Sequence, residues 1–145
     1  MRTAHDRSEN HPRHPRLQLK FRQLPGPYAI LRLSPDVPVP DWAMQGDFTS
    51  ITRTAEELSI VCPADKIPKE LASGPRWICF KLEGPFPFSQ TGVLLSFIEP
   101  LSNNGIPIFA ISTYDTDYVL VQEERGDAAV GVLREAGHEL ICRQD

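Results

Sequence analysis

The chain has 145 residues, of which 41% are hydrophobic and 23% are charged, and its formal net charge is −4. This size suits one ordinary domain or two very small ones, and the composition is that of a globular protein. An acidic chain lacks the basic face that nucleic-acid-binding proteins need, and it is not attracted to anionic lipid. No apolar run approaches the ~20 residues that span a bilayer. We therefore expect a cytoplasmic protein that binds neither nucleic acid nor membrane.

The N-terminal segment 1–16 is polar and rich in His, Arg and Pro. It has no apolar central stretch of the kind found in secretory signals, and no hydrophobic periodicity. We predict a disordered tail, because such a segment has little apolar surface to bury. The segment contains three histidines, which could bind a metal ion, but a flexible polar tail is the better explanation of this composition.

Three cysteines, Cys62, Cys79 and Cys142, are widely spaced. Neither their number nor their spacing is typical of a disulfide framework or a zinc site. Each lies in an apolar stretch, which favours buried free thiols. We expect no metal and no cofactor.

Fourteen prolines divide the chain into short segments, which favours short strands and short helices. In the first half, short β-rich runs alternate with turns and Pro-rich stretches, and no segment has the length of a full helix. The strands predicted there are 17–21, 28–33, 48–54 and 58–62, with at best one helical turn near 41–44.

The second half has a clearer pattern, in which apolar strands alternate with two segments of helical periodicity. Asn104-Gly105 is a typical end for the first helix, and Ser89 or Thr91 is a candidate for its N-cap. The elements predicted there are strand 77–82, a helix up to 103, strands 106–112 and 117–122, helix 125–136 and strand 138–142. This β-α-β-β-α-β order predicts an α+β, ferredoxin-like unit with two helices on one face of an antiparallel sheet.

A faint internal repeat relates Thr54–Val61 to Thr113–Leu120. Both consist of a strand end carrying Thr, an acidic turn and a β-branched strand. The repeat suggests that a first unit, 17–73, is a degenerate copy of a second unit, 74–145.

Several motifs in order along the chain carry a resemblance to a known family. They are Leu24-Pro25-Gly26-Pro27-Tyr28-Ala29, Thr52–Cys62, Gly84-Pro85 with Phe88-Ser89, Thr91-Gly92 and Ile111–Tyr118. With these motifs the chain resembles the small bacterial tandem ACT-domain proteins, stand-alone relatives of the ACT modules in the CASTOR arginine sensors and in aspartate kinases.

The resemblance implies two ferredoxin-like ACT units side by side, and an amino acid or similar small molecule held between them. It places that ligand at the turns flanking the first helix and at the edge of the hairpin that follows. The ligand-binding residues it implies are Gly105, Ile106, Ser112, Thr113, Asp115, Thr116 and Asp117, with Thr54 and Glu56 from the first unit.

Each of these residues also has a purely structural explanation. A carboxylate at Asp115 or Asp117 can pair with an ammonium group, but Asp commonly forms turns. Asp117 begins a strand, where Asp is disfavoured, which favours a functional role. Ser112 and Thr113 can bind a ligand carboxylate or simply satisfy local backbone groups. Glu56 is better explained as part of a solvated turn, and the alternative is contact with a cation across the interface between the units.

No catalytic constellation is recognisable: His138 has no nucleophile near it in sequence, and there is no phosphate-binding loop. We therefore predict a non-catalytic protein that binds or senses a small molecule, most simply an amino acid. The alternative is a protein-interaction or oligomerisation module without such a ligand. A homodimer is compatible with both functions.

Overall fold

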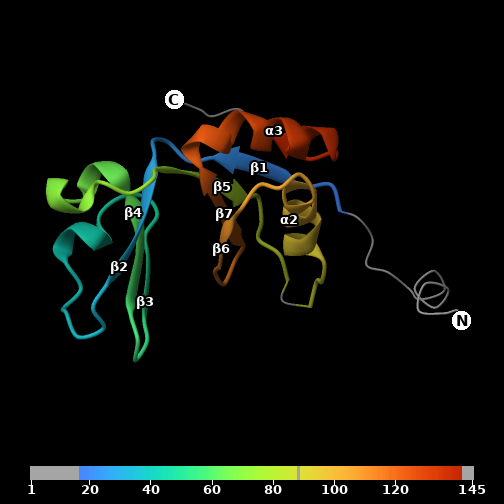
Figure 1. Cartoon of the computed structure of the whole chain (residues 1–145). Helices are drawn as coiled ribbons and strands as arrows, with labels where there is room; N and C mark the ends of the chain where they lie inside the picture. Colours follow the sequence, from blue (N-terminus) through green and yellow to red (C-terminus); the bar gives the residue numbers. More distant parts are fainter. Residues whose placement is uncertain (1–16, 88, 142–145) are drawn as a thin grey trace, which may run out of the picture.

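The computed structural model describes residues 17–87 and 89–141, so the tail predicted at 1–16 and Cys142 lie outside the described ranges. These residues form an α+β fold in which one sheet of eight strands carries two α-helices (Figure 1). The α+β class predicted from the sequence is confirmed. The strands are β1 (Lys20–Gln23), β2 (Tyr28–Leu33), β3 (Ser50–Arg53), β4 (Leu58–Pro63), β5 (Trp77–Leu82), β6 (Phe109–Ser112), β7 (Asp117–Gln122) and β8 (Glu139–Leu140). The helices are α2 (Val93–Asn103) and α3 (Gly126–Glu135), with short 3₁₀ turns at Asp41–Met44, Ala64–Lys66, Lys69–Leu71 and Glu123–Arg125.

The second half follows the predicted β-α-β-β-α-β order from β5 to β8. Strands β5 and β7 begin and end where the sequence predicts, because each is an apolar, β-rich run bounded by turn residues. The predicted strand 106–112 is shorter, since β6 starts only at Phe109. Helix α2 ends as expected, with Gly105 in a positive-φ conformation (71°) after the last turn.

The sheet of this half holds a strand that the sequence analysis assigned to the first unit. Strand β1 pairs antiparallel with β5, with Phe21 opposite Leu82, and parallel with β8, with Phe21 opposite Leu140. The expected four-stranded sheet therefore has five strands, in the order β6-β7-β5-β1-β8. Strand β1 lies between the two strands that would otherwise be neighbours.

The chain bends after β1 and continues along the same strand. The N–H of Leu24 donates to the carbonyl of Cys79 (2.9 Å), and Tyr28 of β2 is paired with Trp77 at the start of β5. Between them Gly26 adopts φ 74°, a conformation that favours glycine. Strand β2 then leaves β5 and pairs with β4, which pairs with β3.

The first half does not form a second ferredoxin-like unit. Among residues 24–73, all of which the structure describes, the strands β2, β3 and β4 are joined by turns and 3₁₀ segments without an α-helix. The sequence lacks a helical period there because prolines interrupt the segment between β2 and β3. The prediction of tandem ferredoxin-like units is not confirmed.

Three hydrophobic cores hold these layers together. The first lies under α2 and α3 and includes Phe21, Phe80, Phe97, Val119 and Leu133. The second packs β2 and the loop before β3 against the side of β5, β6 and β7 that faces away from the helices. It contains Tyr28, Phe48, Val61, Cys79 and Leu120. The third lies on the face of β4 opposite to Val61 and contains Ala43, Leu58, Ile60 and Cys62. Cys62 and Cys79 are buried free thiols, as predicted.

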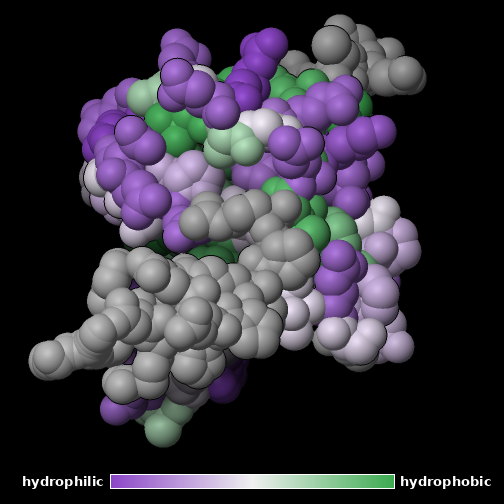
Figure 2. Space-filling model, turned by 90° about the vertical axis from the view of Figure 1, so that its right-hand side faces the viewer, coloured by the Kyte–Doolittle hydropathy of each residue, from purple (hydrophilic) through white to green (hydrophobic). Residues whose placement is uncertain are grey.

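The outer side of the helical layer is polar. Figure 2 shows that the upper part of this face, at the height of α3 in Figure 1, is mostly hydrophilic. This is expected of a helix that buries one side, with Ala129 and Leu133, on a sheet. No helix of the described residues is long and apolar enough to cross a membrane.

Candidate functional site

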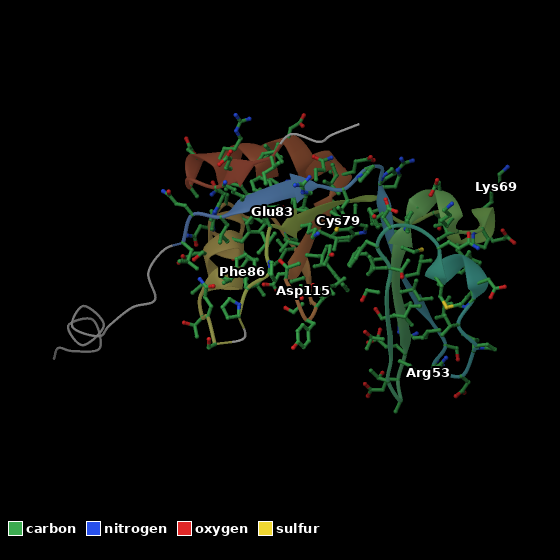
Figure 3. The ribbon with its side chains drawn as sticks, turned by 180° about the vertical axis from the view of Figure 1, so that it is seen from behind. Arg53, Lys69, Cys79, Glu83, Phe86 and Asp115 are labelled. Carbon is green, nitrogen blue, oxygen red and sulfur yellow. The ribbon has the colours of Figure 1, made fainter. Side chains whose placement is uncertain are left out.

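The turn between β6 and β7 and the loop before α2 line an open hollow on the surface, with a volume of about 220 Å³. Figure 3 shows Phe86 of the loop and Asp115 of the turn on the same side of the molecule. The residues lining the hollow are Phe86, Pro87, Gln90, Val93 and the hairpin residues Ser112, Thr113, Tyr114, Asp115, Thr116 and Asp117. Five of the predicted ligand-binding residues therefore meet at one place.

The hairpin turn is fixed by its own threonines. The N–H of Thr113 donates to the carbonyl of Thr116 (2.8 Å), and the Thr113 hydroxyl lies 3.1 Å from the same carbonyl and 3.3 Å from the N–H of Thr116. Ser112 and Asp117 face each other in the ladder, and the Ser112 hydroxyl donates to the Asp117 carboxylate. The Thr113 hydroxyl is therefore engaged by local backbone, as its structural explanation predicts.

The turn is also tied to the end of β5. Thr116 is 5% exposed, and its hydroxyl donates to the carbonyl of Leu82 (2.7 Å). The N–H of Phe86 donates to the carbonyl of Asp115 (3.0 Å). A Cβ at Gly84 would lie 2.9 Å from that carbonyl oxygen, so only glycine permits this approach. The hairpin and the loop consequently form one wall of fixed shape.

The start of α2 closes the hollow on another side, at Val93. Gly92 is the N-cap, with φ 83°, and no side chain caps the helix, so the prediction that Ser89 or Thr91 caps it is wrong. The first turn also contains no acidic residue. The first N–H groups of a helix lack partners within the helix, and the helix dipole favours an anion near them.

The charges around the hollow are of one sign. Asp115 and Asp117 are the only charged side chains among its lining residues. Asp115 is exposed and Asp117 half-buried. The hollow therefore combines two carboxylates and hydroxyls on the hairpin side with Val93, the first residue of α2, on the other. An ammonium group suits the carboxylates, and a helix N-terminus favours an anion.

The structure places Gly105 and Ile106 away from this hollow. They follow the C-terminal end of α2, and a helix of 11 residues is about 16 Å long. The carbonyl of Gly105 accepts a hydrogen bond from Arg125 (3.3 Å), whereas Ile106 is buried in the first core and 4% exposed. Neither lines the hollow formed by the hairpin.

Thr54 and Glu56 lie in the turn between β3 and β4, next to Arg53, which Figure 3 places on a different hairpin from Asp115. The Thr54 hydroxyl accepts hydrogen bonds from the N–H groups of Glu56 (3.0 Å) and Glu57 (3.1 Å). The carbonyl of Glu56 accepts from Arg32 (2.8 Å). The hydrogen bonds of Thr54 and Glu56 are therefore those of a β-turn, and neither residue lines the hollow at the β6–β7 hairpin.

Three further residues line the hollow and were not predicted from the sequence: Phe86 and Gln90 of the loop before α2, and Val93 at the start of α2. The Gly84-Pro85 pair is one of the motifs of the family resemblance, which does not assign the loop after it to the site. The one available signal is that binding residues often lie on loops between the elements of a scaffold.

The comparison with known families identifies the architecture. Residues 72–135 match the family model of the ACT domain. The chain is also 46% identical to protein Atu0741 from Agobacterium tumefaciens, whose crystal structure aligns over 89% of this chain and 96% of that one with a TM-score of 0.82.

The chain contains an ACT domain, and it belongs to the same family as Atu0741. ACT domains are regulatory, non-catalytic modules that generally bind small molecules such as amino acids. In this ACT-domain protein residues 26–70 match a second family model, described as an N-terminal domain. A further similar structure is VC0802 from Vibrio cholerae, at 21% identity and a TM-score of 0.67, covering 83% of this chain and 91% of that one; its title gives unknown function and possible transport protein. At that identity only the fold is comparable.

Proposed function

We propose that the ACT domain binds a single amino acid in the hollow between the β6–β7 turn and the start of α2. The observation that carries the proposal is that Asp115, Asp117 and the first residue of α2 line one small hollow. The ligand ammonium pairs with the carboxylates, and the ligand carboxylate accepts hydrogen bonds from the first N–H groups of α2.

The individual residues have different roles in this proposal. Asp115, Asp117 and the Ser112 hydroxyl contact the ligand, whereas Thr113 and Thr116 hold the turn in shape. Phe86 and Val93 contact the ligand side chain. Gly105, Ile106, Thr54 and Glu56 stay predictions of the family resemblance and are not part of this hollow.

We also propose a division into two units near residue 73, with the first unit donating β1 to the sheet of the second. The two family models, at 26–70 and 72–135, support the boundary. The pairing of β1 with β5 and β8 supports the donation.

Thermal unfolding in the presence of each of the common amino acids tests the function. A ligand at 100 times its dissociation constant stabilises the folded state by about 2.7 kcal/mol. We expect one amino acid or one chemical class to raise the melting temperature, and calorimetry to give a single site. The absence of a shift with every amino acid would contradict the proposal.

The variant that locates the site is Asp117→Asn, which removes a half-exposed charge and leaves the strand intact. We expect the variant to bind the amino acid at least ~10-fold more weakly, since charge-assisted hydrogen bonds are worth about 1.5–3 kcal/mol. Asp36→Asn is the matched control, because Asp36 is an exposed carboxylate on the loop after β2 and does not line the hollow.

The alternative function, an interaction or oligomerisation module, is favoured by one observation. Within residues 17–87 and 89–141, strand β6 pairs with β7 alone, so no described strand covers its other edge. ACT domains commonly dimerise. Light scattering at several protein concentrations distinguishes this function, because it predicts an assembly that persists without ligand and in Asp117→Asn.

A further inference from the structure

A second hollow lies on the N-terminal side of the sheet, where four segments converge. Its volume is about 450 Å³, within the range of small-molecule sites. The segments are the bend between β1 and β2, the loop before β3, the turn after β4 and the residue before β5. The lining residues are Pro25, Gly26, Pro27, Tyr28, Gly46, Asp47, Pro63, Ala64, Asp65, Lys66 and Arg76.

Backbone contacts fix the relative positions of the segments that line this hollow. Tyr28 is paired with Pro63 in the ladder of β2 and β4, and the N–H of Ala64 donates to the carbonyl of Pro27 (2.9 Å). Gly46, at φ 115°, packs so closely that a Cβ there would lie 2.5 Å from Cγ of Pro63. The position of Asp47, the next residue, is thus set by a contact that only glycine allows.

Both signs of charge line the hollow. Asp47 and Asp65 are negative, and Lys66 and Arg76 are positive. Within 17–87 and 89–141, no residue forms an ion pair with Asp47, Asp65 or Lys66. Arg76 has Glu123 at 3.5 Å, but both side chains are about half exposed, and such pairs are weak enough to exchange for a ligand.

Tyr28 provides a second, independent observation. The residue is 2% exposed, and no described residue hydrogen-bonds its hydroxyl. That oxygen is not among the fully buried atoms that lack a partner, so the small exposed part of Tyr28 includes the hydroxyl, on a residue that lines the hollow. Burial, with smaller contributions from Asp47 and Asp65 among others, raises the pKa of Tyr28 to about 12, so the phenol stays protonated and can donate.

We propose that this hollow is a second binding site, for a zwitterion of dipeptide size. Its ammonium group pairs with Asp47 and Asp65, its carboxylate pairs with Arg76 and Lys66, and the Tyr28 hydroxyl donates to one of its carbonyl oxygens. The volume is about twice that of the hairpin hollow, where a single amino acid is proposed. The prolines at 25, 27 and 63 form apolar walls for the ligand side chains.

The two hollows have no lining residue in common, so this site is distinct from that of the proposed function. The two proposals therefore fail independently. Loss of binding at one hollow says nothing of the other.

The test is a titration of the ¹⁵N-labelled full chain with glycyl-leucine at millimolar concentration, followed by two-dimensional NMR. We expect saturable shifts at the amides of Gly26, Tyr28, Gly46 and Lys66. N-acetyl-glycyl-leucine lacks the ammonium group, and glycyl-leucinamide lacks the carboxylate. Each is expected to bind at least ~10-fold more weakly, because each loses a charge-assisted contact.

On the protein side, Asp47→Asn and Arg76→Gln are expected to weaken binding of glycyl-leucine by a similar factor. Asp47 and Arg76 are exposed, so both variants keep the fold, which unchanged amide shifts far from the hollow verify. Asp36→Asn, with the same change of charge away from the hollow, is expected to bind like the parent protein. Absence of saturable shifts, equal binding of the acetylated peptide, or unchanged affinity in both variants would overturn the proposal.

Discussion

The imidazole of His138 accepts a hydrogen bond at Nδ1 from the backbone N–H of Leu19, 119 residues away in sequence (3.1 Å). Its Nε2 lies 2.9 Å from the carbonyl of Ser96. Because Nδ1 accepts, the proton is on Nε2, which donates to Ser96. His138, just before β8, thereby links α2 to Leu19, just before β1, at the place where β1 is inserted into the ACT sheet. It can do so only as a neutral ring.

Stability is therefore expected to fall in mild acid. Burial lowers the pKa of His138 from its usual value of 6.5 in the folded state, so the unfolded chain binds the extra proton first. The stabilisation is complete above about pH 6.5 and is lost as the pH falls toward the folded-state pKa. Urea unfolding between pH 7.5 and about 5 measures this decrease, at most about 1.4 kcal/mol per pH unit.

The matched variant is His138→Gln, which keeps an acceptor and a donor but does not titrate. We expect it to be less stable at pH 7.5 by about 1–3 kcal/mol, since its amide fits the two backbone partners less well. Its stability is expected to change less with pH in this window. Glu83, whose pKa is lowered by its hydrogen bond to Arg22, responds only below its usual value of 4.5. A parallel pH dependence in parent and variant would refute the role of His138.

The contact of the N-terminal half with the ACT sheet is expected to depend on Phe48. Its ring stacks on Tyr118 of β7, with 4.0 Å between ring centres and 15° between planes, and it is 7% exposed. Phe48→Ala is expected to cost about 3–5 kcal/mol in unfolding free energy, measured by denaturant titration. Met44→Ala, at a residue 55% exposed nearby in sequence, is the control and is expected to change stability by less than about 0.5 kcal/mol. Equal effects of the two substitutions would show that Phe48 does not hold the two halves together.

Sequence reasoning found the local part of this fold and missed the long-range part. Strands β5 and β7 were bounded correctly because apolar, β-rich runs between turn residues depend on nearby residues alone. The insertion of β1 between β5 and β8 was not predictable in that way, because its partners lie about 60 and 120 residues downstream. The role of His138 was hidden for the same reason, since both of its partners are backbone groups of distant elements.

The candidate site likewise has a part that the sequence predicts and a part that it does not. Ser112, Thr113, Asp115, Thr116 and Asp117 meet because one hairpin carries them all. Gly105 was grouped with them by family resemblance, but it follows the C-terminal end of α2, and the whole length of that helix separates it from Val93, which lines the hollow. Phe86 reaches the hollow through a backbone hydrogen bond to Asp115, a contact between two loops with no periodic signal.

Thr116 is expected to be structural. Its buried hydroxyl donates to the carbonyl of Leu82, so Thr116→Val keeps the shape and leaves that carbonyl without this donor. We expect a loss of about 1–3 kcal/mol in unfolding free energy. Thr52→Val, at an exposed position of β3, is the control and is expected to be neutral or slightly stabilising. A neutral Thr116→Val would indicate that the hydroxyl does not hold the hairpin against β5.

Gly84→Ala is expected to reshape the hairpin hollow without unfolding the protein. The added Cβ would lie 2.9 Å from the carbonyl oxygen of Asp115, which is backbone and can yield only if the turn and the loop move apart. Because Asp115 moves with the turn, amino-acid affinity is expected to fall at least ~10-fold, a change of about 1.4 kcal/mol measured by calorimetry. Gly131→Ala on α3 meets nothing within 4 Å and is the control; it is expected to stabilise the helix by about 0.5–1 kcal/mol and to leave affinity unchanged. If Gly84→Ala binds the amino acid as the parent does, the ligand does not depend on the contact between Gly84 and Asp115, and the proposed hollow is wrong.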